Sequence, residues 1–257
     1  MTRKARNPVD PNLIAVFHRV GDGGSWLAML FRRTTAGVAV VETRSFPPNG
    51  RGDGRDIPSW LIEKQVAQVL AVLPSSSVIC RVVQLPAGSP DRLLPALRLQ
   101  AEAHLLGGVP PHRVGLAVLP GASSDNGRSG LILAWPESAT VDLPPIGDAS
   151  AVLTCVPEIA GMAALMGNHR PAEPLIWANR DDGSVAIALA HAGGVAYRAT
   201  REDAADLETW RAGIGRAVAE TAFTVGHSQE YLAALMPEVD ARIASMARMG
   251  LWLPAEL

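Results

Sequence analysis

The sequence predicts an α/β protein, either one large domain or two small lobes, in which each half is a strand meander followed by helices. The first observation is residues 175–200, where three short apolar runs are separated by a polar corner and a glycine-rich corner. The second is residues 13–46, which repeat this alternation of apolar runs and turn residues. The third is that each meander is followed by apolar residues at helical spacing, at 58–73 and at 207–225. The two halves therefore share one order of elements.

Composition places the chain among ordinary globular proteins and excludes several classes of function. The 257 residues are 48% hydrophobic and 19% charged with a formal net charge of -2, so the sequence does not predict nucleic-acid binding. No apolar run reaches the roughly 18 to 20 residues of a membrane span, and two cysteines do not make a disulfide scaffold. The only lysines are Lys4 and Lys64, which removes most candidates for a P-loop or Schiff-base lysine. We therefore expect a cytoplasmic protein.

The first half is expected to contain strands and two helices after a disordered tail at 1–12. Its first helix is predicted over 58–73, because Pro58 suits the first turn and five apolar residues follow at helical spacing: Ile62, Val66, Val69, Leu70 and Leu73. The other predicted elements, in order, are strands at 13–20, 26–31 and 38–46, an exposed loop at 47–56, a strand at 77–85, a helix from 90 to about 106, and a hairpin of strands at 113–119 and 131–135.

The second half is expected to begin at a boundary in residues 136–150, which are rich in Pro, Asp and Ser. This boundary would separate a first lobe at 13–145 from a second lobe at 150–257. The elements predicted in the second lobe are a strand at 151–155, a helix at 157–167, the three strands of 175–200, a long helix ending at Gly226, and C-terminal helices.

The GlyHisSerGln sequence at 226–229 resembles the nucleophile turn of hydrolases and acyltransferases. That turn needs a glycine two residues after the serine, where this chain has Glu230, and no histidine follows Ser228. A helix cap at Ser228 is the better interpretation. The six histidines and two cysteines also show no ligand spacing, so we expect no catalytic residue and no metal site.

Two corners between predicted strands carry the residues that fit a phosphate site. Glycines let backbone N–H groups approach phosphate oxygens, Ser25 can donate to one, and Asp22 can hold a magnesium ion through water. Both corners also suit plain turns, and the short spacing of the first favours a turn. The residues concerned are Asp22, Gly24 and Ser25 in the first corner, and Asp181, Asp182 and Gly183 with Ser184 in the second.

Four stretches, in this order, resemble the PilM family of cytoplasmic platform proteins in type IV pilus assembly and the cytoplasmic domain of the GspL family in type II secretion. They are the strand, AspGlyGlySer corner, strand and strand at the start; the helix at 58–73; ValValGlnLeuProAlaGlySerPro with a helix containing AlaGluAla (101–103) and then GlyGlyValPro; and the run from CysValProGluIleAla to the strands of 175–200. The resemblance covers roughly residues 13–225.

The resemblance implies an actin-like (RNase H-like) fold of two lobes, each a strand meander with a mixed sheet and flanking helices. The second lobe would be abbreviated. In such proteins ATP lies in the cleft between the lobes where the phosphate loops are kept. The first corner matches the first phosphate loop, although the lysine that often follows it is absent. In the second loop Ala178 or Asn179 stands where the family has an Asp, and the acidic residues of the corner come later.

With incomplete phosphate loops, the resemblance implies a non-catalytic scaffold, a pseudo-ATPase, at the cytoplasmic face of a bacterial inner membrane. It would bind the cytoplasmic tail of a membrane partner, with the assembly ATPase as a second candidate partner. No cofactor is expected. The alternative is an actin-like ATPase or phosphotransferase that binds Mg-ATP through Asp22, Ser25 and Asp181 or Asp182.

Overall fold

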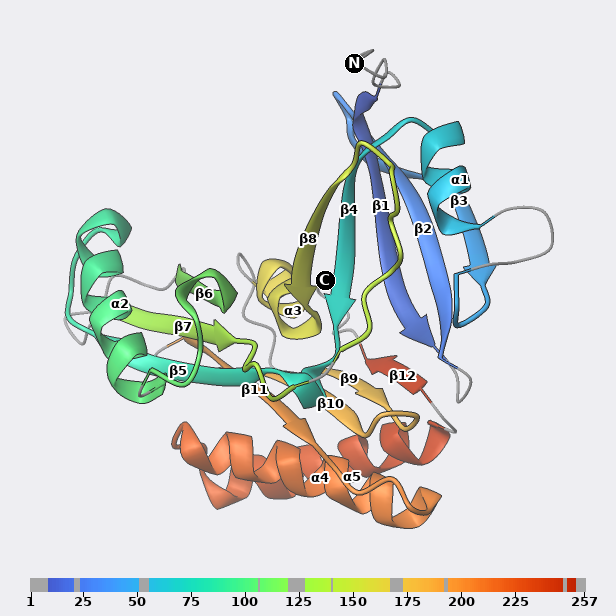
Figure 1. The fold of residues 1–257 in the computed structure, drawn as a ribbon. Coiled ribbons are helices and arrows are strands. Elements are labelled where there is room, and N and C mark those ends of the chain that lie inside the picture. Colours follow the sequence, from blue (N-terminus) through green and yellow to red (C-terminus); the bar gives the residue numbers. More distant parts are fainter. Residues whose placement is uncertain are drawn as a thin grey trace. The chain divides into compact units, whose positions relative to one another are not determined.

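The computed structural model describes residues 9–20, 24–50, 56–105, 107–119, 128–139, 141–166, 173–191, 194–246 and 249–252. The chain divides into two compact units, one of residues 1–73 and 141–156 and the other of residues 74–140 and 157–257. Figure 1 shows the helices and strands of both units. Among the described residues, no helix is long and apolar enough to cross a membrane.

The first unit is built on a five-stranded mixed sheet. Its strands are β1 (Asp10–Val20), β2 (Ser25–Thr34), β3 (Gly37–Phe46), β4 (Val66–Leu73) and β8 (Val152–Pro157). Their order is β3-β2-β1-β4-β8, with β1 antiparallel to β2 and parallel to β4. Alternate residues of β1 and β2 are buried, because successive side chains of a strand point to opposite faces. The predicted α/β class with a mixed sheet is confirmed.

Helix α1 (Ile57–Glu63) supplies the aromatic centre of this unit's core. The Trp60 ring is fully buried and meets the Phe17 ring edge-on, with 6.0 Å between ring centroids. Its Nε1 donates to Glu42 Oε1 on β3 at 3.1 Å, and Lys64 Nζ lies 2.6 Å from the other oxygen of that carboxylate. The indole therefore fills the core while its polar atom keeps a hydrogen bond.

The predicted helix over 58–73 is wrong beyond Glu63. The chain turns at Gln65, whose φ of 57° lies in the left-handed region, and the following residues form β4. Burial in β4 alternates over Val69, Ala71 and Leu73, which is the period of a strand. The apolar residues fit a helix and a strand equally well, and the parallel pairing with β1 selects the strand.

The two compact units do not follow the predicted lobe limits at 13–145 and 150–257. Strand β8 lies beside β4 in the first sheet, so residues 141–156 belong to the first unit, whereas residues 74–140 belong to the second. Pairing between strands so distant in sequence leaves no local signal. The predicted tail at 1–12 overlaps β1, which begins at Asp10, and residues 1–8 lie outside the described residues.

The second unit contains a three-stranded sheet covered by one helix. Strands β5 (Ile79–Leu85), β7 (Arg128–Ala134) and β6 (Val114–Val118) are ordered β5-β7-β6, and the short helices η1 (Ser75–Ser77) and η2 (Pro111–Arg113) precede β5 and β6. The antiparallel β6–β7 pair confirms the predicted hairpin, whose connection at 120–127 lies outside the described residues. Helix α2 (Pro90–Leu105) buries Leu93, Leu97 and Ala101 against this sheet.

The second unit also contains a four-stranded antiparallel sheet. Strands β9 (Leu175–Asn179), β10 (Ser184–His191), β11 (Gly194–Arg201) and β12 (Met249–Trp252) are ordered β11-β10-β9-β12, which confirms the three strands predicted in 175–200. Helices α4 (Leu207–Thr224) and α5 (Gln229–Ser245) lie together on one face and share a core with Ile176, Ile187 and Leu189. Helix α3 (Glu158–Met166) contacts β10 and β11 (Figure 1).

Candidate functional site

The first predicted corner, between β1 and β2, is described only in part. Gly24 has a φ of 64°, in the left-handed region that favours glycine, and Ser25 begins β2 opposite Val20. Asp22, the residue predicted to hold magnesium, lies outside the described residues. Of this corner, Gly24 and Ser25 are described, and Ser25 already belongs to β2.

An arginine that the sequence analysis missed fixes this corner. Arg19 Nε donates to the carbonyl oxygen of Gly24 at 3.0 Å, and its guanidinium lies 5.5 Å from the centroid of the Trp26 ring. The same guanidinium pairs with the carboxylate of Asp142, which balances its charge. An arginine beside a glycine-rich corner was a usable signal for an anion site, but its pairing with a carboxylate so distant in sequence was not visible.

The second predicted corner, between β9 and β10, uses its polar groups to close its own turn. Asn179 Oδ1 accepts a hydrogen bond from the backbone N–H of Asp181 at 3.1 Å. Asp182 Oδ1 accepts one from the backbone N–H of Ser184 at 2.8 Å. Asn and Asp side chains that bond the backbone two residues on are a common way to stabilise a turn. Three of the predicted residues, Asp181, Asp182 and Gly183, are therefore brought together in one turn.

Gly183 is required by the backbone of this turn. Its φ is 70°, and a Cβ atom at this position would stand 2.5 Å from the carbonyl oxygen of Glu202. The backbone N–H of Glu202 in turn donates to the Gly183 carbonyl oxygen at 2.9 Å. The turn is thus held against the chain that follows β11, which leaves no room for a side chain here.

A buried polar junction lies directly after this turn. Ser184 Oγ donates to Ser76 Oγ at 2.9 Å, and both the backbone N–H and the hydroxyl of Ser75 donate to Glu158 Oε2 at 2.8 Å. Ser75 is 1% exposed and Ser184 is 0% exposed, so no substrate reaches either hydroxyl. These bonds join η1, α3 and β10, and the junction is structural. The sequence analysis missed it because its members are far apart in the chain.

The end of β9 does not fit the magnesium site that the actin-like resemblance implies. Magnesium in nucleotide sites is held by carboxylate oxygens. Of the two residues that can stand at this position, Ala178 has no side-chain ligand atom. Asn179 carries a neutral amide, is 2% exposed, and its oxygen already accepts a hydrogen bond. Among the described residues, no group of three or more His, Cys, Asp or Glu side chains is placed to hold a metal ion.

Three further polar or thiol side chains also have structural surroundings. Ser228 Oγ accepts a hydrogen bond from the backbone N–H of Tyr231 at 3.1 Å, which confirms the predicted helix cap. His227 Nε2 lies 2.6 Å from the carbonyl oxygen of Ala190. Burial raises the pKa of the Cys80 thiol to about 12, which disfavours the thiolate form that acts as a nucleophile.

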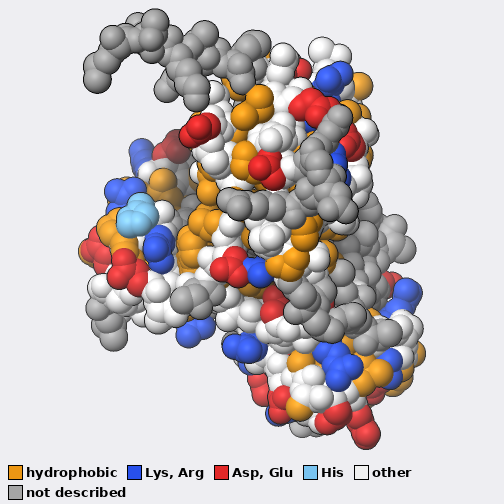
Figure 2. Space-filling view, turned by 45° about the vertical axis from the view of Figure 1, so that its right-hand side comes forward, with side chains coloured by type: hydrophobic (Ala, Val, Ile, Leu, Met, Phe, Trp, Pro, Cys, Tyr) orange, Lys and Arg blue, Asp and Glu red, His pale blue; other side chains and the backbone are white. Residues whose placement is uncertain are grey.

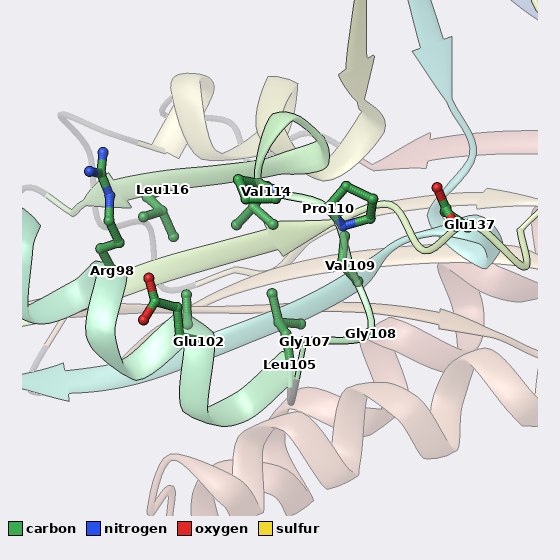
Figure 3. Close-up of a pocket in the computed structure, with 12 residues that line it drawn as sticks. Arg98, Glu102, Leu105, Gly107, Gly108, Val109, Pro110, Val114, Leu116 and Glu137 are labelled. Carbon is green, nitrogen blue, oxygen red and sulfur yellow. The ribbon is translucent and has the colours of Figure 1, made fainter.

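A groove that the sequence analysis missed lies between α2 and β6 in the second unit. Its volume is about 770 Å³, within the range of ligand sites. Figure 3 shows Val114 and Leu116 extending from β6 toward α2, which presents Leu105 on the facing side. Three charged residues also line the groove: Arg98, Glu102 and Glu137. The alternation of Val114, Leu116 and Val118 predicted a strand but not its place at the edge of a sheet.

One face of the molecule carries side chains of both charges. Figure 2 shows acidic and basic side chains interspersed with hydrophobic ones on the visible face. This mixture agrees with the net charge of -2.

Comparisons with known proteins find matches among solved structures. No protein-family model matches it, and no curated protein matches it. Among solved structures, it is similar to a chain of a PilM-PilN type IV pilus biogenesis complex, with 18% sequence identity and a TM-score of 0.49, over 91% of this chain and 69% of that one. These values are too low to assign a family or a function.

Proposed function

We propose that this protein is a non-catalytic, actin-like adaptor that scaffolds a type IV pilus or type II secretion platform at the cytoplasmic face of a bacterial inner membrane. The observation that carries the proposal is the order of three of the four stretches that resemble the PilM and GspL families. The remaining stretch, the helix predicted at 58–73, ends at Glu63 and is followed by β4. The opening stretch forms the meander β1, β2 and β3; ValValGlnLeu ends β5 and leads into α2; CysValPro ends β8 and leads into α3. Strands β9, β10 and β11 follow α3 along the chain, as in the fourth resembling stretch.

The non-catalytic part of the proposal is supported by how the second corner uses its side chains. Its amide and one carboxylate oxygen accept hydrogen bonds from the backbone of the turn, and the adjacent Ser184 hydroxyl is buried. A phosphate loop needs donors and carboxylates that point outward at a ligand. We therefore propose that the protein acts through the partners that it binds rather than through a bound nucleotide.

The partner that we propose is an inner-membrane protein of the pilus or secretion system, bound through its cytoplasmic tail. The experiment is affinity capture from solubilised bacterial inner membranes, with the full chain as bait and its folding checked by circular dichroism. We expect a pilus or secretion component with a cytoplasmic tail to be enriched over a heat-unfolded bait. Repeated capture without any such component would contradict the proposal.

The alternative function, an actin-like ATPase or phosphotransferase, is separated by calorimetry with Mg-ATP. We expect no heat of binding at micromolar nucleotide. Micromolar binding that disappears in the Asp22→Ala variant would favour the enzyme and overturn the adaptor.

A further inference from the structure

The outer edge of β6 presents backbone groups that the sheet does not use. Among the strands that the structure describes, the order is β5-β7-β6, so β6 has a described neighbour on one side only. Trp135 N donates to Arg113 O at 3.0 Å, and Leu119 N donates to Ser129 O at 2.9 Å. The backbone groups of residues 113 and 119 therefore point toward β7. Because this bonding alternates along an antiparallel pair, the N–H and C=O groups of Leu116 point away from β7.

The groove lies beside this edge, on the face of β6 that looks toward α2. Val114 and Leu116 are half-buried and pack against the core beneath α2, whereas the intervening Gly115 is exposed. A strand added to the edge would continue the sheet, and its alternate side chains would point to the α2 side. Those side chains would meet the apolar lining formed by Leu105, Val114 and Leu116.

The charges of the groove favour a basic occupant. Of its three charged lining residues, Glu102 and Glu137 are acidic and only Arg98 is basic. Figure 3 shows Arg98 and Glu102 on α2 at one end of the groove and Glu137 past Pro110 at the other. The segments of membrane proteins that flank their spans on the cytoplasmic side are rich in Lys and Arg. Such a segment complements the Glu137 end.

We infer that the β6 edge and the α2–β6 groove together bind an extended, basic peptide by strand addition. The backbone of Leu116 pairs with the peptide, alternate apolar side chains enter the groove, and a Lys or Arg of the peptide pairs with Glu137. The source of the peptide, the cytoplasmic tail of a membrane protein, rests on the proposed function. The mode of binding rests on the geometry alone.

The first test uses the full chain and a synthetic peptide of about ten residues that alternates valine and threonine and ends in two lysines. Fluorescence anisotropy measures binding, and hydrogen exchange followed by NMR reports on single amides. We expect the Leu116 amide to become protected when the peptide binds, while Ala117, already bonded to β7, changes little. A bound peptide that leaves Leu116 unprotected, as a helix in the groove would, overturns strand addition.

The second test changes the peptide rather than the protein, so it cannot fail through misfolding. Two versions of the peptide are made, each with N-methyl groups at every second residue. In one version the methylated amides lie on the edge that would pair with β6, and in the other they lie on the opposite edge. Methylation of the pairing edge removes its donors and should weaken binding about tenfold or more, whereas methylation of the other edge should have little effect. Equal effects from the two peptides contradict pairing with β6.

The third test reverses charges. Glu137→Lys should weaken binding about fivefold, and a peptide with glutamates in place of its lysines should recover that loss. Asp240→Lys, an exposed carboxylate of α5 outside the groove, is the matched control and should leave binding unchanged. Identical behaviour of the two protein variants rules out the assigned contact. Protection of Leu116 that rises with protein concentration without peptide would instead assign the edge to a second copy of this chain.

The outcomes separate this inference from the proposed function. If the peptide binds as described but capture recovers no pilus or secretion component, peptide binding at the β6 edge is supported and the proposed adaptor function is rejected. If capture succeeds equally with wild type and with Glu137→Lys, and the peptide does not bind, the function stands and the groove is not its site.

Discussion

The β9–β10 turn and the β6 edge differ in where their hydrogen-bonding groups are used. The turn is rich in polar residues, yet Asn179 and Asp182 both accept bonds from its own backbone. The β6 edge is apolar in sequence, yet the backbone of Leu116 points away from its sheet beside a groove of about 770 Å³. In this protein the polar turn uses its hydrogen-bonding groups internally, whereas the apolar strand β6 leaves backbone groups available for a partner.

The difference follows from what each region must satisfy. A tight turn leaves N–H groups unbonded, and short polar side chains at the right spacing bond them. An edge strand leaves N–H and C=O groups unbonded along its whole length, and no side chain of that strand can reach them all. A binding partner is one way to satisfy such an edge.

The largest effect is expected at the centre of the turn. Gly183→Ala introduces a Cβ atom 2.5 Å from the carbonyl oxygen of Glu202 at a φ of 70°. We expect the free energy of unfolding to fall by about 3 kcal/mol, measured by urea denaturation. The control is Gly226→Ala, where φ is 82° but no atom lies within 4 Å of the added Cβ, and about 1 kcal/mol is expected. Equal losses at the two glycines would show that the contact with Glu202 is unimportant.

A smaller loss is expected at the buried junction that follows the turn. Ser184→Ala removes the hydroxyl that donates to Ser76 Oγ and accepts from the Ser76 backbone N–H. The expected loss is about 1 to 2 kcal/mol in the free energy of unfolding, because the Ser76 groups are left without this partner. Ser45→Ala, on the exposed part of β3, should change stability by less than about 0.5 kcal/mol. A Ser184 variant as stable as the Ser45 variant would argue against a structural junction.

The smallest effect concerns pH. Burial is the main cause that raises the pKa of Glu202, whose backbone holds Gly183. A carboxyl with a raised pKa in the folded state stabilises the protein when protonated, and this contribution is lost as pH rises through the folded pKa. Glu202→Gln should therefore raise the free energy of unfolding slightly at pH 7, and the gain should vanish below about pH 4. A gain that grows on acidification has the wrong sign.

Local patterns in the sequence predicted the elements that depend on local chemistry. The strands of 175–200, the hairpin of β6 and β7, helix α2 and the cap at Ser228 are all present. Residues 66–73 were misassigned to a helix, because their apolar spacing fits both periods and the pairing of β4 with β1 decides between them. Strand β8 shows the same limit, since its place beside β4 depends on residues far from it in the chain.

The candidate site was predicted less well than the fold. The sequence located the polar corner at Asp181, Asp182 and Gly183. It could not show that the Asp182 carboxylate accepts a hydrogen bond from the backbone of the same turn. It predicted β6 as a strand without showing that this strand is an edge, because edge position is set by sheet order. Arg19 illustrates the same point, since its partner Asp142 comes from a distant segment.

The most direct test of the account is capture from inner membranes repeated after the tail of the captured protein is deleted. The full chain serves as bait, and the pilus or secretion component is quantified by mass spectrometry in both membrane preparations. We predict enrichment from the intact preparation and its loss when the cytoplasmic tail is absent. No such component in the first preparation, or equal recovery from both, would contradict an adaptor that binds a membrane partner's tail.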